Sequence, residues 1–328
     1  MCIENVVRDL QDENGEDGDD MIENEEFAWD DVNNMELPIK EVRAARAEEM
    51  AHMKGKIFKV VPRSECYDRT GRAPISTKWV DTDKSHGQGQ MRVRSRWVAR
   101  DFMTRGERDR EDLFCATPPL ELLRFLVSRM VTTHEGDQGR RRKMLFIDVR
   151  KPHLVPECSE DVYVELPVEA QCGKGECGKL VHWLYGCRRA EQAWEDHYAG
   201  VLGKAGFLRG AASPVSFFNA NRMLWCIVHG DDFTFTGYDE DLDYATEIME
   251  AAYELKVRGR LGNDARDVQE IDVLGRVIKC ADCGCSWQAD PRHRRLILEH
   301  FGFDEKTKVL TTNGVKEIAT EGGKTRPH

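Results

Sequence analysis

The strongest constraint in this chain is a pair of strand-like runs joined by a turn that carries two adjacent carboxylates. Residues 224–229 are apolar and residues 232–237 alternate Phe and Thr, so both runs are predicted to be strands. Gly230 eases the bend between them, and Asp231 and Asp232 follow it. Adjacent carboxylates repel each other unless solvent or a cation neutralises them. The turn is therefore either an ordinary hairpin tip, where Asp is common, or one side of a metal site.

A third carboxylate favours the metal site. Asp148 lies near the end of the apolar run 144–149, which follows the basic string 140–143. An ionised side chain in a buried strand is costly unless it is paired or ligated. If this strand lies beside the hairpin, Asp148, Asp231 and Asp232 converge on one spot. Such a cluster is expected to bind two Mg²⁺ ions, with Mn²⁺ as an alternative, about 3.5–4 Å apart, as in-line nucleotidyl transfer requires.

The charge of the chain is unevenly distributed. The 328 residues carry a net charge of −11 and are enough for one large or two modest domains. Residues 1–36 hold fourteen Asp and Glu against Arg8 alone, a net charge of −13, whereas residues 37–150 have a net charge of +9. The sequence therefore predicts an acidic disordered tail over residues 1–37 and a basic body that suits phosphate backbones.

Cysteine usage and hydropathy indicate an intracellular protein. The eleven cysteines are scattered and odd in number, which favours reduced thiols over a disulfide framework. Cys280-Ala-Asp-Cys283 has the spacing of half a zinc site, but Cys172 and Cys177 do not supply the other half, so a hairpin turn is favoured. No run is long and apolar enough to cross a membrane, and no apolar signal core is present. Cytoplasm and nucleus cannot be distinguished.

The predicted elements alternate irregularly between strand and helix. This order favours an α+β fold, with a palm-like sheet and a strand-rich appendage, over a regular doubly wound fold. No glycine-rich phosphate loop is found. Helices are expected at 38–54, 118–133, 189–204, 239–253 and 292–301, and strands at 56–61, 75–80, 91–98, 144–149, 162–166, 224–229, 232–237, 255–261 and 273–278.

Six motifs follow one another along this framework. The first three are Lys78-Trp-Val80, the basic run Arg94-Ser-Arg-Trp-Val-Ala-Arg-Asp-Phe102, and Ile147-Asp-Val-Arg-Lys-Pro-His-Leu154 around the first carboxylate. The others are Glu160–Pro167, Leu180–Trp194 and the His229–Gly237 hairpin. In this order and spacing, residues 40 to 302 resemble the reverse transcriptase domain of Copia-type (Ty1/copia) retrotransposon Pol polyproteins.

The resemblance implies an RNA-directed DNA polymerase, a nucleotidyltransferase with a right-hand fold. Fingers, palm and partial thumb are expected over residues 38–302, with a flexible C-terminal tail over 303–328. The partners would be an RNA or DNA template with its primer and deoxynucleoside triphosphates, with no membrane involved. Asp148, Asp231 and Asp232 match the catalytic metal ligands of the family.

Further substrate-binding residues come from the same resemblance. Lys78, Arg94 and Arg96 lie where the fingers meet the incoming triphosphate, although such residues also suit an exposed sheet face. Tyr185 and Gly186 match the loop that lines the nucleotide and template pocket, although this segment also suits a simple strand-to-helix turn.

The chain departs from the family at several positions near the carboxylates. His153 replaces an aromatic residue that acts as a wall against the ribose 2′-hydroxyl, and Pro152 replaces the usual Ala. His229 and Gly230 replace Tyr and Val before the Asp pair, and Glu191 replaces a Pro. None of these changes removes a metal ligand, but they leave a rival open, a decayed remnant that only binds nucleic acid.

The accompanying polyprotein segments are not recognised in this sequence. No ribonuclease H motif follows Phe301, and no integrase or protease motif precedes residue 40, so a fragment or a decayed copy of a polyprotein is expected. A third alternative, an unrelated metal-dependent phosphohydrolase, shares the carboxylates but does not explain the basic strands.

Overall fold

The computed structural model describes residues 27–85, 90–102, 115–133, 137, 139–281, 284–289, 291–304 and 307. The chain divides into two compact units, Met1–Arg260 and Leu261–His328. No helix of the described segments is both long and apolar enough to cross a membrane.

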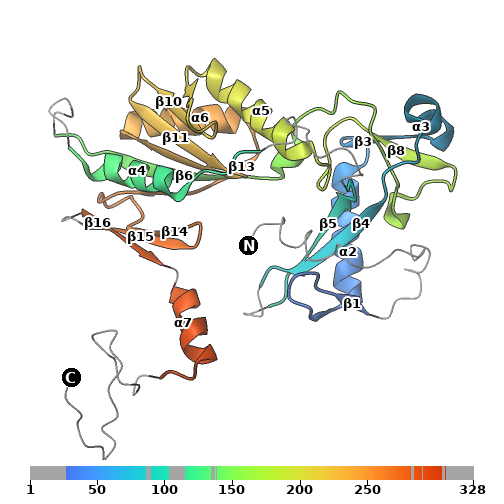
Figure 1. The fold of residues 1–328 in the computed structure, drawn as a ribbon, viewed down its shortest axis with the longest axis horizontal. Coiled ribbons are helices and arrows are strands. Elements are labelled where there is room, and N and C mark those ends of the chain that lie inside the picture. Colours follow the sequence, from blue (N-terminus) through green and yellow to red (C-terminus); the bar gives the residue numbers. More distant parts are fainter. Residues whose placement is uncertain are drawn as a thin grey trace, which may run out of the picture. The chain divides into compact units, whose positions relative to one another are not determined.

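A six-stranded sheet forms the centre of the first unit (Figure 1). Its strand order is β13-β6-β12-β11-β10-β9. Strand β12 of the β11–β12 hairpin also pairs with β6, so two segments distant in sequence become neighbours. The strands are β6 (Lys143–Val149), β9 (Leu208–Arg209), β10 (Ser216–Asn219), β11 (Leu224–His229), β12 (Asp232–Gly237) and β13 (Leu255–Leu261).

Helices cover both faces of this sheet. Alternate side chains of β6, Leu145, Ile147 and Val149, pack with α5 (Ala190–Lys204) and α6 (Asp239–Ala252) in the largest core cluster. Helix α4 (Leu120–Val131) also packs on β6, β11 and β12, and Figure 1 shows it on the other side of the sheet. Asp148 alternates with these residues along β6, so its side chain lies on the opposite face of the sheet from the one that contacts α5 and α6. It therefore shares its face with Met144 and Phe146.

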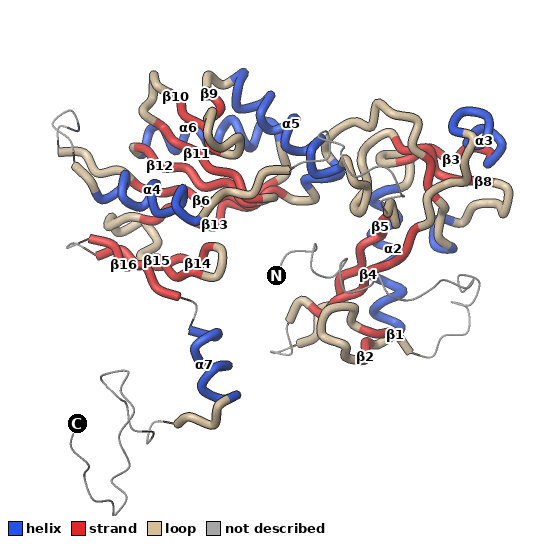
Figure 2. The backbone as a smooth tube through the Cα atoms, viewed as in Figure 1, coloured by secondary structure: helices blue, strands red, loops and turns tan. Residues whose placement is uncertain are grey.

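The basic part of the first unit is a two-stranded ribbon, β4 (Thr77–Asp83) and β5 (Val93–Ala99), packed against α2 (Ile39–Met53). Trp97 is fully buried in a second core cluster with Met53 and Phe58. A small sheet of β3, β8 and β7 adjoins it (Figure 2). The remaining elements are β1 (Ala28–Trp29), β2 (Glu36–Leu37), β3 (Phe58–Pro62), α3 (Arg63–Thr70), η4 (Pro152–Leu154), β7 (Tyr163–Val164), η5 (Val168–Ala170) and β8 (Glu176–Leu180).

The second unit contains the meander β14 (Glu270–Val273), β15 (Arg276–Ala281) and β16 (Gly284–Ala289), followed by α7 (Pro291–His300). The sequence predicted one strand over 273–278. The structure divides it, because Leu274 and Gly275 both have positive φ, 50° and 65°, and form the tight turn between β14 and β15.

Two other predictions are corrected. The predicted disordered tail of residues 1–37 is wrong for residues 28–37, because β1 and β2 form a hairpin whose Asp30 and Asp31 accept backbone hydrogen bonds from β4. Residues 1–26 lie outside the described residues. The all-reduced cysteines are also wrong, because Cys280 and Cys285 form a disulfide across the β15–β16 hairpin. The sequence favoured a hairpin turn at this segment, and the hairpin places Cys280 and Cys285 directly opposite each other. Most of the predicted tail 303–328 lies outside the described residues.

Candidate active site

Two of the three predicted carboxylates lie directly opposite each other in the central sheet. Asp232, the first residue of β12, pairs in register with Asp148 on β6. Cross-strand partners point to the same face, so both side chains lie on the face of Met144 and Phe146. Asp231 belongs to the turn, where its carbonyl accepts the N–H of Val149 at 2.9 Å. The turn is thus hydrogen-bonded to the end of the Asp148 strand.

The three carboxylates influence one another electrostatically. Burial raises the pKa of Asp148, and the negative charge of Asp231 raises it further. The pKa of Asp232 is raised in the same way, by burial first and by Asp231 second, while Arg258 on β13 lowers it through an ion pair of 3.4 Å. The ionised pair is therefore under repulsion that a bound cation would relieve.

A metal ion fits this arrangement only in part. In the described parts of the chain, no three His, Cys, Asp or Glu side chains are grouped closely enough to hold a metal ion among them. The predicted three-ligand cluster is therefore not formed by side chains alone. Mg²⁺ usually takes one or two carboxylates together with water and substrate phosphates, so the facing Asp148 and Asp232 suit it.

Basic side chains lie near these carboxylates. Arg94 and Arg96 alternate with the buried Ser95 and Trp97 along β5, so they share the face of the ribbon that α2 leaves open. Burial lowers the pKa of Arg96, the charge of Arg94 lowers it further, and Asp231 acts in the opposite direction. Arg96 therefore lies within electrostatic reach of the turn.

Lys84 is a basic neighbour that sequence reasoning missed. Burial lowers its pKa, as do Arg94 and Arg96, whereas Asp148 raises it. Lys84 is the residue after β4, and its backbone N–H donates a hydrogen bond to the carbonyl of Arg92 at 2.9 Å. No motif marks this lysine, and only the pairing of β4 with β5 groups it with the arginines.

Lys78 has a different neighbour. Its register partner on β5 is Val98, which puts it on the same ribbon face as the arginines. Burial raises the pKa of Asp31 in the N-terminal hairpin, and the positive charge of Lys78 acts against this rise. The structure therefore does not connect Lys78 with the carboxylates.

His153 and Tyr185 lie against each other, with ring centroids 5.5 Å apart. Tyr185 is buried and His153 is half-buried, and the buried Nδ1 of His153 has no hydrogen-bond partner among the described residues. Burial, together with Arg96, lowers the pKa of His153 to about 4, so the ring is neutral at physiological pH. Pro152 begins the short helix η4 after Lys151, which has a φ of 48° and forms an ion pair with Glu49 at 2.6 Å.

Gly186 allows the loop after Tyr185 to lie against β5. Its φ is 79°, and a Cβ atom there would overlap the carbonyl oxygen of Ala99. The N–H of Ala99 bonds to the carbonyl of Tyr185 at 2.7 Å. Only glycine fits this position, which joins Tyr185 to the strand that carries Arg96.

The remaining departures from the family have local structural roles. Gly230 has a φ of 61° with open space around it, which suits the turn. His229 is the last residue of β11 and pairs with Asp232. Glu191 lies in the first turn of α5, where a negative charge favours the helix dipole.

Trp194 on α5 supports the turn, and the sequence did not identify it as a site residue. Its Nε1–H donates a hydrogen bond to the carbonyl of Gly230 at 2.8 Å, and its ring is buried against Tyr198 and Phe233. The only sequence signal was its place at the end of the 180–194 motif. The tertiary contact makes it a positioning residue for Asp231 and Asp232.

Replacing Trp194 with Phe is expected to lower the activity of this site about tenfold while costing about 1 kcal/mol of stability beyond the loss of ring volume. Phe keeps an aromatic ring but leaves the Gly230 carbonyl without its donor. Trp97→Phe is the matched stability control, because Nε1 of Trp97 has no hydrogen-bond partner in the described part of the chain. Thermal unfolding and the Mg²⁺ concentration for half-maximal activity should be compared. An unchanged Mg²⁺ requirement in Trp194→Phe would contradict the positioning role.

Comparisons with known proteins identify the family of this chain. The family model described as "Reverse transcriptase (RNA-dependent DNA polymerase)" matches residues 58–263, which is more than half of the chain. Among solved structures, apo telomerase from Candida Tropicalis has a TM-score of 0.38 and 8% identity over 76% of this chain and 60% of that one. Telomerase from Candida albicans, in complex with a telomeric RNA fragment, has a TM-score of 0.45 and 9% identity over 76% and 50%.

The predicted α+β fold class is confirmed by the mixture of helices and sheets along the chain. The chain spans 60% and 50% of the two telomerase chains. The match to the family model includes the ribbon with Arg94 and Arg96, the Asp148 strand and the Asp231 turn. The chain belongs to the reverse transcriptase (RNA-dependent DNA polymerase) family.

Proposed function

We propose that this chain is the polymerase part of a Copia-type retrotransposon reverse transcriptase, which adds deoxynucleotides to a primer 3′-hydroxyl on an RNA or DNA template. The observation that carries the proposal is the register of Asp148 with Asp232 beside the Asp231 turn, within electrostatic reach of Arg96 and Lys84. Facing carboxylates with basic neighbours suit a substrate that brings both a polyphosphate and divalent cations.

Each group has a role in this proposal. Arg96, Arg94 and Lys84 bind and orient the triphosphate by charge-assisted hydrogen bonds, which reduces the entropy cost of reaching the reactive geometry. His153 and Tyr185 contact the sugar and the base. Asp148 and Asp232 would hold Mg²⁺ together with water and substrate phosphates, and Asp231 would join them as the third predicted ligand. Two such ions would supply charge neutralisation to the reacting oxygens when bound. Trp194 keeps the turn in place.

Primer extension tests the proposal. The full chain is incubated with a labelled DNA primer on an RNA template, with deoxynucleoside triphosphates and Mg²⁺ or EDTA. Mg²⁺-dependent extension by the wild type, its loss in Asp231→Ala and its retention in the surface control Asp68→Asn are expected. Full activity in Asp231→Ala would overturn the assigned roles.

A second candidate is a remnant that binds nucleic acid without polymerising. The buried Nδ1 of His153, which follows Pro152, favours this candidate because it has no hydrogen-bond partner among the described residues. An active nucleotide pocket is expected to pair its buried polar atoms. Salt-dependent binding of a primer-template duplex without extension at any Mg²⁺ or Mn²⁺ concentration would support this candidate.

His153→Phe is expected to remove an acid sensitivity of the fold. In the wild type, the unfolded chain binds a proton at His153 below about pH 6.5, but the folded chain does so only near pH 4. Stability from this residue is therefore present at neutral pH and lost as pH falls from about 6.5 to 4, by about 3 kcal/mol in total.

Urea unfolding at pH 7 and pH 4.5 measures this effect. The stability difference between the two pH values should be smaller in His153→Phe than in the wild type, and equal differences would refute the burial of the ring. The same variant should discriminate more strongly against ribonucleotides in primer extension, because phenyl packs on the sugar without offering a polar atom.

A further inference from the structure

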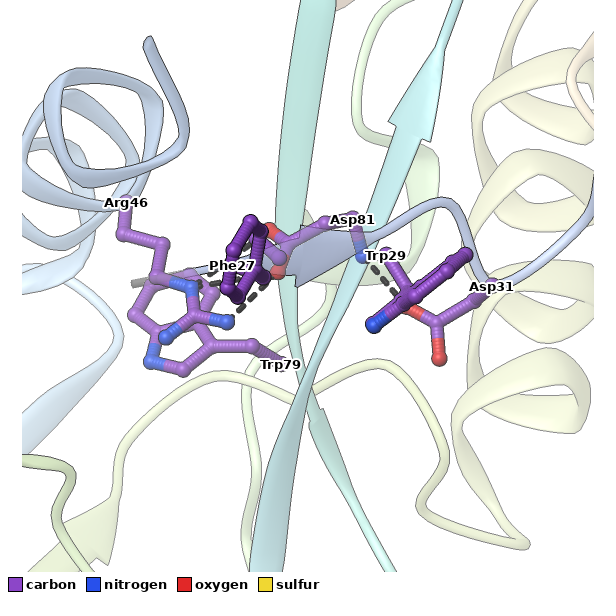
Figure 3. Close-up of a pocket in the computed structure, with 7 residues that line it drawn as sticks. Phe27, Trp29, Asp31, Arg46, Trp79 and Asp81 are labelled. Carbon is purple, nitrogen blue, oxygen red and sulfur yellow. Dashed lines mark hydrogen bonds and ion pairs between the residues drawn. The ribbon is translucent and has the colours of Figure 1, made fainter. Parts of the chain in front are cut away.

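A second concave site lies beside the N-terminal hairpin, and none of the residues that line it belongs to the proposed active site. It is a cavity of about 410 Å³ between β1, α2 and β4. In the view of Figure 3, Arg46 and Trp79 lie on one side of it, Trp29 and Asp31 on the other, with Phe27 between them. The polymerase proposal does not use this cavity.

The hairpin is held rigidly against β4 by its aspartates. The N–H of Asp31 bonds to the carbonyl of Asp81 at 2.9 Å, and the N–H of Asp81 bonds to Oδ2 of Asp31 at 2.7 Å. Oδ2 of Asp30 accepts the N–H of Asp83 at 2.7 Å. The cavity wall is therefore ordered before any ligand arrives, which lowers the entropy cost of binding.

The wall exposes aromatic surface. Phe27 and Trp29 are 55% and 59% exposed, although both lie at one short hairpin. Trp79 is buried and tethered, because its Nε1–H donates to Glu169 at 3.0 Å. Aromatic faces attract cationic groups, and grouped exposed rings mark binding sites more often than scattered ones.

Negative charge exceeds positive charge around the cavity. The one lining cation, Arg46, is already paired with Asp81 at 2.6 Å and with Glu169 at 3.7 Å. Asp31 forms no ion pair with any residue in the described segments, and Lys78 affects it only electrostatically. A carboxylate oxygen beside an exposed indole is thus available to a ligand.

The chain before the cavity adds to this charge. Residues 1–26 precede the hairpin and hold eleven Asp and Glu against Arg8, a net charge of −10. Such a segment attracts basic partners over a Debye length and repels phosphate backbones. Charge complementarity therefore favours a basic polypeptide over nucleic acid at this cavity.

We propose that the cavity binds an arginine or lysine side chain of a basic peptide belonging to a partner protein. The cationic group lies between the carboxylate of Asp31 and the ring of Trp29, and the neighbouring peptide backbone covers Phe27. Arg46 holds Asp81 away from the ligand, which leaves Asp31 as the recognising carboxylate. The acidic segment raises the association rate without contributing to specificity.

Fluorescence anisotropy of labelled twelve-residue peptides tests the proposal with the full chain. The peptides alternate Gly with Arg, with Lys or, as a charge-reversed control, with Glu. Trp29→Ala and Asp31→Asn are each expected to weaken binding of the Arg peptide about tenfold. Asp20→Asn is the matched control, since it removes the same charge from the acidic segment, and it should change the dissociation constant less than twofold. Thermal unfolding of each variant checks the fold.

Three outcomes would overturn the proposal. Equal weakening by Asp31→Asn and Asp20→Asn would show attraction to the acidic segment alone. Equal binding of the Glu peptide would exclude recognition of a cation. Binding of a single-stranded oligonucleotide that Trp29→Ala weakens would assign the cavity to base stacking. Preference between the Arg and Lys peptides identifies the side chain, because guanidinium stacks on indole better than ammonium does.

Discussion

Asp148→Asn is expected to abolish primer extension and, at the same time, to stabilise the metal-free protein. The loss of activity should be about a thousandfold or more, because a carboxylate that binds the reacting phosphates' cations has no neutral substitute. The gain in stability follows from the raised pKa of Asp148, whose ionised form is opposed by burial and by Asp231. We expect a rise in the unfolding midpoint of about 2–4 °C in EDTA at pH 7.

The pH dependence has a definite sign. A carboxyl group with a raised pKa in the folded chain contributes stability below its ordinary pKa of about 3.9, and this contribution is lost as pH rises through the raised value. The stabilisation by Asn should therefore be small near pH 4 and grow towards pH 7. Calorimetry across this range, with and without Mg²⁺, measures it.

Asp68→Asn on α3 is the control, because this carboxylate lies on the protein surface. It should alter neither activity nor the unfolding midpoint. If Asp148→Asn lowered the midpoint at pH 7 in EDTA, the repulsion inferred between Asp148 and Asp231 would be wrong.

Gly186→Ala is expected to lower the free energy of unfolding by about 3 to 5 kcal/mol, more than a methyl group added at any other glycine of the described chain. Two costs combine at this position. The φ of 79° is strained for any residue with a side chain, and the added Cβ would overlap the Ala99 carbonyl, which is fixed backbone. The loop carrying Tyr185 would have to move away from β5, so nucleotide binding should weaken as well.

Gly71→Ala separates the two costs. Gly71 caps α3 with a φ of 66° and has open space around its Cα, so alanine there should cost only the conformational strain of about 1–2 kcal/mol. Urea unfolding of both variants gives the difference, which is the cost of the Ala99 contact. Similar values for the two would show that the loop yields easily and that Gly186 is not required for close packing.

The main elements were predictable because their periods are local properties of the sequence. The Asp148 run and the Asp231 hairpin read as strands from their branched and aromatic residues, and helices such as 239–253 were found within one residue. Helix α3, by contrast, begins at Arg63 within a polar segment that has no apolar stripe. Its buried Cys66 packs against Tyr163 and Cys177, contacts that no local pattern reveals.

The candidate site residues also divide into those that the sequence reveals and those that only tertiary contacts reveal. Asp148, Asp231 and Asp232 became candidates because adjacent or buried carboxylates are chemically conspicuous in a sequence, and Arg94 and Arg96 became candidates through the family resemblance. Lys84, Arg258 and Trp194 were missed, since each acquires its role only through a partner distant along the chain. The cavity beside the hairpin was missed because the acidic composition of residues 1–37 concealed two aspartates that form specific backbone hydrogen bonds.

The sequence by itself determined most of the longer strands and helices and singled out the carboxylates, because hydrophobic period, turn chemistry and the cost of buried charge act within a few residues. Only the tertiary structure decided that Asp148 faces Asp232, that Trp194 reaches the Gly230 carbonyl, and that Trp29 and Asp31 border a cavity with Arg46. These relations depend on strand register and on packing between distant segments, where a shift of one residue would turn each side chain to the other face.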